Sequence, residues 1–469
     1  MKQLKGIRTA PSGRAVEDSP HLGLKGAVGR RFAFVLAVAL IFTFAGSRVA
    51  GATESSGQGP MPWPLDAPQT QGPGPQDILQ TPLFLPGEVD LSALGVNPTE
   101  LLTVGLQPSV PSSTSDNGVL IVDDNGLGCP NFQYTTIQAA VDAAAPGDTI
   151  KVCAGTYTEQ VTIAGPGKDG LTLFAAPDLQ AIIKAPPAML GPKAIVRVSD
   201  AHDVTIRYFT ITGPGAGCCN TIRYGVFVDN GGSALITDNH ITMIQDTPFS
   251  GSQNGLGVGV GRTFAPDGPT TGSATVVHNL IDKYQKGGVL VDNFGSSAEV
   301  AYNEVDGAGA TAVIAQNGIQ VSRGAQGDVH HNKVSQNVYT PTTNDATGIL
   351  LFCDPVVGDV NCFGTTGATG ASHVHHNDVF LNEVGIALWY VAGTADVSYN
   401  NSRNNLNDGI HAYEPTSENL IAHNKAFQNG GNVGQYDCVD DTIPTLNNWL
   451  KDLGRTENQV GLCKQAGPQ

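Results

Sequence analysis

Acidic and aromatic side chains recur at one position of a repeated motif in this sequence. The motif is a Gly followed by alternating apolar residues, and the fourth residue after the Gly is Asp229, Asp292, Ser322, Phe352, Trp389 or Tyr413. If successive copies are neighbouring β-strands, the two aspartates lie two strands apart, at about 10 Å. That separation is near the upper limit for a pair of carboxylates that hydrolyse a glycosidic bond with inversion. Asp229 and Asp292 are therefore our candidate catalytic residues.

The aromatic half of the same column could stack on sugar rings. With the residues that follow each strand it nominates a substrate-binding set: Arg323, Phe352, Trp389, Tyr390, Tyr413 and Glu414. A simpler interpretation of the whole column is that Val-Asp-Asn merely ends a strand in a turn.

Histidines recur at a second position, directly before a repeated Asn. The residues there are Asp238, His278, Tyr302, His331, His376, Tyr399 and His423. We expect His331 to stack on His376 and His330 on His375, because neighbouring strands lie about 4.8 Å apart. Four such imidazoles, His330, His331, His375 and His376, could hold a transition metal ion such as copper or zinc. The alternative is a column of flat side chains that stack on one another.

All eight cysteines lie after residue 52. An even number of cysteines in an exported chain favours disulfides. The pairs suggested by position are Cys129 with Cys153, Cys353 with Cys362, and Cys438 with Cys463. Cys218 and Cys219, adjacent in the chain, must form a vicinal bridge, stay free or exchange partners.

An internal repeat explains these columns. The Gly motif occurs at Gly225, Gly255, Gly288, Gly318, Gly348, Gly385 and Gly409, and an Asn follows about 14 or 15 residues later in most copies. Each copy supplies short strands that pair with the copies above and below, around a core of stacked apolar residues. The Asn fits a sharp turn, because Asn tolerates the left-handed backbone conformation and its amide can bond to the next stacked Asn.

The repeat predicts an all-β fold, a right-handed single-stranded parallel β-helix of about ten coils over residues 118–437. An N-terminal helix capped by Thr135 or Thr136 and stopped by Pro146-Gly147 is expected to cover one end. A disulfide-bonded segment, residues 438–469, is expected to cover the other.

Composition agrees with such a chain. It has 58 Gly, 29 Pro and 14% charged residues, which suits many short strands and turns. Residues 1–52 hold eight basic and two acidic residues, so the remainder has 17 basic against 40 acidic, a net charge of about −23. This acidic body excludes a nucleic-acid partner, since phosphates would be repelled. No cofactor is required, although the surplus acidic side chains could bind Ca²⁺.

The N-terminus has the features of an export signal. Arg30 and Arg31 precede the apolar run Phe32–Phe44, and Ala50-Gly51-Ala52 is a cleavage pattern. Residues 1–52 are thus a predicted export signal and residues 53–117, rich in Pro, Gly and Ser, a disordered linker. The protein is expected to be secreted or cell-surface, and membrane-bound only where the segment stays uncleaved.

Three segments at the start of the repeat region resemble a known superfamily. Thr136-Ile-Gln-Ala-Ala, Pro146-Gly-Asp-Thr-Ile and Ala154-Gly-Thr-Tyr-Thr-Glu are similar to the opening of pectin-lyase-like right-handed β-helix proteins. The Gly-Ile…Asn coils are similar to their parallel β-helix repeats, and the segment from Tyr436 to Cys463 resembles the tail of secreted bacterial members.

The resemblance implies a fold but selects no enzyme family. The Arg-Pro-Trp motif of pectin methylesterases, the Gly-His-Gly and Arg-Ile-Lys motifs of polygalacturonases, the Arg-x-Pro-x-x-Arg element of pectate lyases and the Asp-Pro-His-Asp element of uronan epimerases do not occur in the sequence. The favoured hypothesis is a protein that engages a polysaccharide or cell-surface glycan along its coil face, as a binder, hydrolase or lyase. A non-catalytic adhesion or structural module and a copper-handling protein are the alternatives. The oligomeric state is not predicted.

Overall fold

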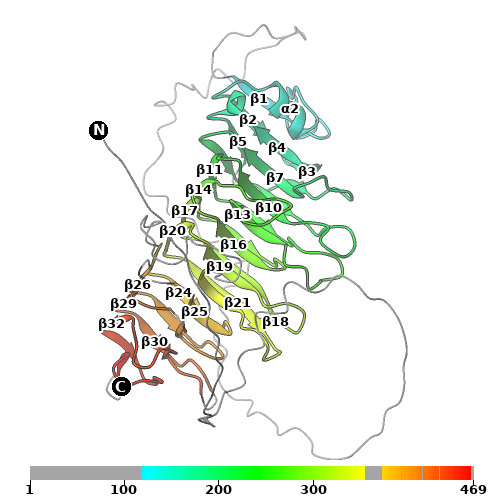
Figure 1. Cartoon of the computed structure of the whole chain (residues 1–469). Coiled ribbons are helices and arrows are strands. Elements are labelled where there is room, and N and C mark those ends of the chain that lie inside the picture. Colours follow the sequence, from blue (N-terminus) through cyan, green and yellow to red (C-terminus); the bar gives the residue numbers. More distant parts are fainter. Residues whose placement is uncertain are drawn as a thin grey trace, which may run out of the picture. The chain divides into compact units, whose positions relative to one another are not determined.

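The computed structural model describes residues 118–176, 178–353, 372–391, 393, 395–414, 416–431 and 434–465. Within them the chain forms three parallel sheets of 12, 10 and 12 strands, and consecutive coils follow one another from α2 to β32 (Figure 1). Each coil contributes one strand to each sheet in turn. The predicted right-handed parallel β-helix of about ten coils is confirmed.

The three sheets are named A, B and C. Sheet A consists of β1 (Val119–Val122), β2 (Thr149–Val152), β5 (Thr172–Ala175), β8 (Val204–Arg207), β11 (Ser233–Thr237), β14 (Ser273–Val277), β17 (Ser297–Ala301), β20 (Gln326–His330), β23 (Ser372–His375), β26 (Ala395–Ser398), β29 (Leu420–Ala422) and β32 (Asn448–Leu450).

Sheet B consists of β3 (Gly155–Thr158), β6 (Ala181–Lys184), β9 (Thr210–Thr212), β12 (His240–Thr242), β15 (Leu280–Asp282), β18 (Glu304–Thr311), β21 (Lys333–Tyr339), β24 (Asp378–Phe380), β27 (Asn401–Arg403), β30 (Lys425–Phe427), β33 (Asp452–Gly454) and β34 (Cys463–Gln465).

Sheet C consists of β4 (Val161–Ala164), β7 (Ala194–Ser199), β10 (Tyr224–Asp229), β13 (Leu256–Val260), β16 (Gly287–Asp292), β19 (Asn317–Ser322), β22 (Thr347–Phe352), β25 (Val384–Trp389), β28 (Ile410–Tyr413) and β31 (Cys438–Asp440). The last strands of all three sheets extend the coils into residues 438–465.

Alternate residues of the strands fill the interior. On sheet C the inward positions of β16 and β19 are Val289, Val291, Ile319 and Val321, all buried in one continuous apolar core. Most of the residues between them are buried as well, so many sheet C strands are covered on both faces. A run of apolar residues with few polar breaks is the expected pattern for such a strand.

A column of glycines lets the coils approach closely on sheet C. A Cβ on Gly288 would lie 2.6 Å from the carbonyl oxygen of Gly318, and one on Gly318 would lie 2.6 Å from that of Gly348. The register also corrects one alignment. Tyr224 pairs with Leu256, so the glycine in this column is Gly257 and not Gly255.

The predicted helix is α2, Ile137–Ala143, with Thr136 as its N-cap. The side chain of Gln138 donates to the carbonyl of Thr162 and accepts from its N–H, so it satisfies the free edge of β4. The backbone N–H groups of Ile137 and Gln138 donate to Glu159. These contacts cover the first strand of sheet C; a role in closing the whole end of the β-helix stays a prediction.

Three disulfides join described cysteines: Cys129–Cys153, Cys218–Cys219 and Cys438–Cys463. The vicinal bridge is thus the form taken by Cys218 and Cys219. Cys353 is also disulfide-bonded, whereas its predicted partner Cys362 lies outside the described residues, as do the predicted export signal and linker.

Buried asparagines form hydrogen-bonded ladders along the stack of coils. In the longest, both the backbone N–H and the side-chain amide of each Asn donate to Oδ1 of the next: Asn239, Asn279, Asn303, Asn332, Asn377, Asn400 and Asn424. The ladder starts where Phe209 N–H donates to Asn239, and ends on Asp452, which accepts from Asn424.

A second ladder was not foreseen from the sequence. It runs through Asn337, Asn382, Asn405 and Asn429 and ends on Asp437. A shorter one runs from Asn419 to Asn447 and ends on Asp440. All three end on a carboxylate.

The substitution Asn332→Ala is expected to destabilise the protein strongly. It removes the acceptor of the buried Asn303 N–H, one of the two acceptors of the Asn303 side-chain amide, and the side-chain donor to the Val300 carbonyl. At about 1–3 kcal/mol for each buried group that loses a hydrogen bond, the free energy of unfolding should fall by roughly 3–5 kcal/mol. Denaturant unfolding measures this, with Gln253→Ala, in an exposed loop, as the control. A change below about 1 kcal/mol would contradict the ladder's role.

Asp452 should make stability depend on pH. Burial raises its pKa from 3.8 to about 7, and among the described residues its Oδ2 has no hydrogen-bond partner. Between pH 3.8 and about 7 the unfolded chain ionises first, so stability falls as pH rises, by up to roughly 4 kcal/mol.

The variant Asp452→Asn keeps the acceptor for Asn424 and should lose this slope, so its advantage over the wild type should grow between pH 5 and pH 8. The exposed Asp178→Asn is the control. Parallel stability curves for wild type and Asp452→Asn would show that the carboxyl is not strained by burial.

Candidate functional site

The predicted acidic and aromatic column exists on the outer face of sheet C. Register pairs Asp229 with Ser199, Asp292 with Ser322, Ser322 with Phe352, Phe352 with Trp389, and Trp389 with Tyr413. Asp229 and Asp292 end β10 and β16, with β13 between them. The sequence therefore placed these side chains in the right order.

Both candidate catalytic aspartates are buried in ion pairs with arginines. The two oxygens of Asp229 accept from Arg197, which lies one coil earlier, at 2.7 Å and 3.0 Å. Asp292 accepts from Arg323 at 3.0 Å, from the Ser322 hydroxyl at 2.8 Å and from the backbone of Thr263. Burial of an arginine–carboxylate pair is a sufficient structural reason for each Asp; a catalytic role stays a prediction.

Arg323 joins the acidic half of the column to the aromatic half. Its guanidinium lies over two rings, 4.7 Å from the centroid of Phe264 and 5.1 Å from that of Phe352. The same group pairs with Asp292. Arg323 is therefore held rigidly by contacts on several sides.

The aromatic half forms a partly exposed cluster. The ring of Trp389 is 6.0 Å from Phe352, edge-on, and 5.3 Å from Tyr413, stacked at 25°. Tyr390 stacks on Trp389 at 6.2 Å from the end of the strand. The cluster packs on Leu350, Val384 and Ala387, and the exposed Glu414 follows it. The structure thus brings together the predicted binding residues of the last coils.

A buried histidine beside this cluster was missed from the sequence. The ring of His411 stacks 3.6 Å from that of Tyr413, and its Nδ1 lies 2.9 Å from Asp408 and its Nε2 3.2 Å from Asp441. Burial lowers the pKa of His411, but the two carboxylates outweigh it and raise the value to about 9. His411 is therefore a cation near neutral pH.

Two more carboxylates lie nearby, Asp345 in the segment before β22 and Glu383 directly before β25. The Tyr413 hydroxyl donates to Asp345 at 2.7 Å. Glu383 accepts from the backbone of Tyr339 and Ala346 and so holds both ends of residues 339–346. Burial, together with the nearby Asp345, raises the pKa of Glu383 to about 7. The alternation of inward and outward residues along β28 could have identified His411. Asp345, Asp408 and Asp441 lie in loops, and no sequence pattern shows that these loops approach His411 and Tyr413.

The predicted histidine column lies at the corner between sheets A and B. His278, Tyr302, His331, His376, Tyr399 and His423 stack in one continuous series, with ring centroids 4.8–5.2 Å apart. His330 stacks on His375 at 5.0 Å, so both predicted stacking contacts exist. Each ring of the column stands on a residue with a positive φ of 55–59° directly before a ladder Asn.

The two histidine pairs have the same internal geometry. Nδ1 of His330 lies 3.0 Å from Nδ1 of His331, and the same distance separates His375 from His376. On the outer side, Nε2 of His330 faces Glu299 at 3.3 Å and Nε2 of His375 faces Asp328 at 3.1 Å. Burial and the neighbouring imidazoles lower the pKa of His331.

A shallow depression lies on sheet A next to these pairs. It has a volume of about 380 Å³ and is lined by Ser273, Thr275, Glu299, Gln326, Asp328 and His373, among others. Its polar lining comes from four successive coils.

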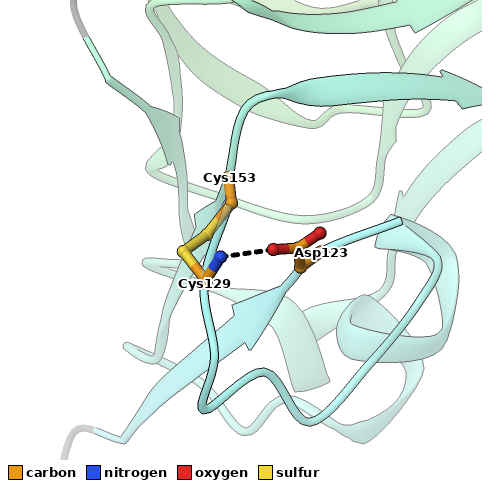
Figure 2. A group of neighbouring side chains, drawn as sticks. All are labelled: Asp123, Cys129 and Cys153. Carbon is orange, nitrogen blue, oxygen red and sulfur yellow. Dashed lines mark hydrogen bonds between the residues drawn. A yellow bond between two sulfur atoms is a disulfide. The ribbon is translucent and has the colours of Figure 1, made fainter. Parts of the chain in front are cut away.

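Across the described ranges, two sets of three His, Cys, Asp or Glu side chains have ligand atoms that all lie within 4.8 Å of one another: Asp123 with Cys129 and Cys153, and Cys218 and Cys219 with Asp246. Figure 2 shows the first set, where the N–H of Cys129 donates to Asp123 across from the disulfide. Burial raises the pKa of Asp123, but backbone N–H donors outweigh it and the net shift is downward.

The cysteines of both sets are disulfide-bonded, so neither offers thiolate ligands. Neither of the two sets in the described part of the chain consists of carboxylates alone. Binding of Ca²⁺ by the surplus acidic side chains therefore stays a prediction. No helix in that part is long and apolar enough to cross a membrane.

Comparisons with known proteins agree with the architecture. Residues 194–390 match the family described as right handed beta helix region. The uncharacterized protein YwoF of Bacillus subtilis (strain 168) is 24% identical over 68% of this chain and 71% of its own length.

Two solved structures are similar at low identity. A complex of XylC with xylose is 13% identical, covers 68% of this chain and 70% of its own, and has a TM-score of 0.43. The Dettilon tailspike protein is 15% identical, covers 72% of this chain and 62% of its own, and has a TM-score of 0.49. The family match, the three parallel sheets and the asparagine ladders together identify this chain as a right-handed parallel β-helix protein.

Proposed function

We propose that this protein binds a polysaccharide or a cell-surface glycan on the outer face of sheet C. The observation that carries the proposal is the aromatic cluster of Phe352, Trp389 and Tyr413, which is in register across three consecutive coils and partly exposed. Rings repeated at the coil spacing of about 4.8 Å suit an extended chain of sugars, whose apolar faces can contact the exposed parts of successive rings.

The charges around the cluster favour a neutral glycan at this end of the sheet. Asp345, Asp408, Asp441 and Glu414 lie at or next to the aromatic residues, and His411 balances one of the four negative charges. Carboxylates accept hydrogen bonds from sugar hydroxyls and repel anionic groups. A few fixed polar groups beside aromatic walls are typical of ligand sites.

Export is part of the proposal. Stable disulfides form in oxidising compartments, and the three bridges between described cysteines are consistent with a secreted or cell-surface location. A glycan partner belongs to the same location.

Glycan binding itself needs no acid–base group. The same surface would therefore serve this protein as a non-catalytic adhesion module or as a hydrolase or lyase. In the catalytic form, Asp229 and Asp292 would supply the two carboxylates. Their ion pairs with Arg197 and Arg323 would then have to open when the substrate binds.

Trp389→Ala is expected to weaken glycan binding at least tenfold, because it removes the central ring of the cluster. Retention on a panel of immobilised polysaccharides, followed by calorimetry on any that bind, measures the effect. Tyr399→Ala, at an exposed ring on another face, should bind like the wild type, and Trp389→Phe should retain most of the affinity. Undiminished binding by a folded Trp389→Ala variant would exclude this site.

Asp229→Asn distinguishes the two roles of the acidic column. We expect a fall of roughly 2 kcal/mol in the free energy of unfolding, because Arg197 loses its buried partner, with glycan affinity unchanged. Assays for reducing ends and unsaturated products on the same panel measure turnover. Loss of turnover without loss of stability would instead support the catalytic assignment.

A further inference from the structure

We propose that His330 with His331, and His375 with His376, form two separate bidentate sites for a divalent transition metal ion that prefers right-angled coordination, such as Cu²⁺ or Ni²⁺. The sites lie on the corner between sheets A and B, away from the aromatic cluster of sheet C. The proposal does not depend on glycan binding.

The nitrogen atoms are already at chelating distance. In each pair the two Nδ1 atoms are 3.0 Å apart. With metal–nitrogen bonds of about 2.0–2.1 Å, this separation gives an angle of about 94° at the metal. A tetrahedral ion such as Zn²⁺ would need roughly 3.3–3.4 Å between the same atoms, whereas square-planar or octahedral ions take the angle observed.

The carboxylates outside each pair set the correct tautomer. Nε2 of His375 faces Asp328, and Nε2 of His330 faces Glu299. An N–H directed at a carboxylate leaves the lone pair on Nδ1, and such carboxylate–histidine arrangements accompany most metal-ligating histidines.

The partner ring can complete the chelate while it stays neutral itself. In the metal-free protein, the Nδ1–H of His331 can donate to Nδ1 of His330. When a metal ion binds, this proton leaves Nδ1, and solvent returns one to the exposed Nε2 of the same ring. The ring stays neutral and offers a second lone pair; the same holds for His376.

Coil spacing keeps the two sites separate. His331 stacks on His376 at 5.1 Å and His330 on His375 at 5.0 Å, nearly parallel in both cases. Four nitrogens at the corners of a rectangle about 3 Å by 5 Å cannot all bind one ion, because half its diagonal is about 2.9 Å, well beyond a bond of about 2.1 Å. Consistently, no three ligand atoms that include these imidazoles lie within 4.8 Å of one another in the described residues.

Both sites are open to ions from solvent. His331 and His376 are exposed, and His330 and His375 are partly exposed. The remaining coordination positions would be filled by water or by an external ligand.

Titration of tag-free protein with Cu²⁺, by calorimetry and by metal analysis after dialysis, tests the proposal. Two ions should bind per chain, and Ni²⁺ should bind better than Zn²⁺. Electron paramagnetic resonance of the Cu²⁺ form should show dipolar broadening from two ions about 5 Å apart, the coil spacing.

The variants separate the two sites. His331→Asn suits the left-handed backbone at this position and should reduce the stoichiometry to one ion and abolish the broadening; His331→Asn with His376→Asn should abolish both sites. Asp328→Asn should lower the affinity of the second site about tenfold. The matched control, His278→Asn with His423→Asn, changes two histidines of the same column that have no histidine neighbour in sequence, and should still bind two ions.

Unchanged binding in the His331→Asn, His376→Asn variant would overturn the proposal. So would binding lost equally in the His278→Asn, His423→Asn control. One ion per chain with a four-nitrogen spectrum would overturn the two-site form. Circular dichroism spectra that match the wild type will show that each variant is folded.

Discussion

The rest of this structure depends on a directional chain of hydrogen bonds between buried amides. Each ladder Asn donates twice to the carbonyl oxygen of the next, and accepts twice from the one before. Such a chain needs a donor at its start and an acceptor at its end. The backbone of Phe209 supplies the donor, and Asp452, which closes the ladder, is an acceptor in place of a further amide. The carboxylate therefore ends the ladder. It accepts the hydrogen bonds from Asn424, because no further Asn follows to accept them.

The ladder also fixes what the surface displays. Since Asn332 must point inward, the residue before it takes a left-handed backbone conformation and points outward, as do its equivalents in the neighbouring coils. Six rings stack for this reason, although they mix His and Tyr. On sheet C, too, a repeated residue of the coil fixes the position of the outward side chains. There the closely approaching glycines keep Phe352, Trp389 and Tyr413 in register. Columns of like side chains are thus a consequence of the fold before they are evidence of a function.

The sequence predicts well those features that depend on the repeat. The Gly motif and the following Asn gave the coils, the longest ladder and the order of residues in both columns. The motif failed at Gly255, because Gly255-Leu-Gly257 offers two glycines and only pairing with Tyr224 selects the second. The ladder of Asn337, Asn382, Asn405 and Asn429 was not predicted, because the Gly-to-Asn spacing of the repeat identifies a single Asn in each coil.

Contacts between coils at loops were not predictable at all. Asp345, Asp408 and Asp441 are distant in sequence and meet around His411 and Tyr413 only through the paths of three connections. The arginines that pair with Asp229 and Asp292 come one from the coil before and one from the coil after. Spacing along the chain places a carboxylate on a face, but it does not show which cation a neighbouring coil supplies to it.

The coil spacing itself decides which chemistry each column can perform. A sugar polymer is extended, so it can contact rings on several coils at once, and a column of rings in register adds contacts along one ligand. A metal ion is a point, and its ligands must converge within about 2.1 Å of it, which rings about 5 Å apart on neighbouring coils do not. In the histidine column, the ring nitrogens that converge belong to residues adjacent in the same coil, as in the two histidine pairs at 3.0 Å. In a parallel β-helix, an extended ligand can therefore bind along the helix axis and contact several coils. A metal ion can be bound by neighbouring residues within a single coil.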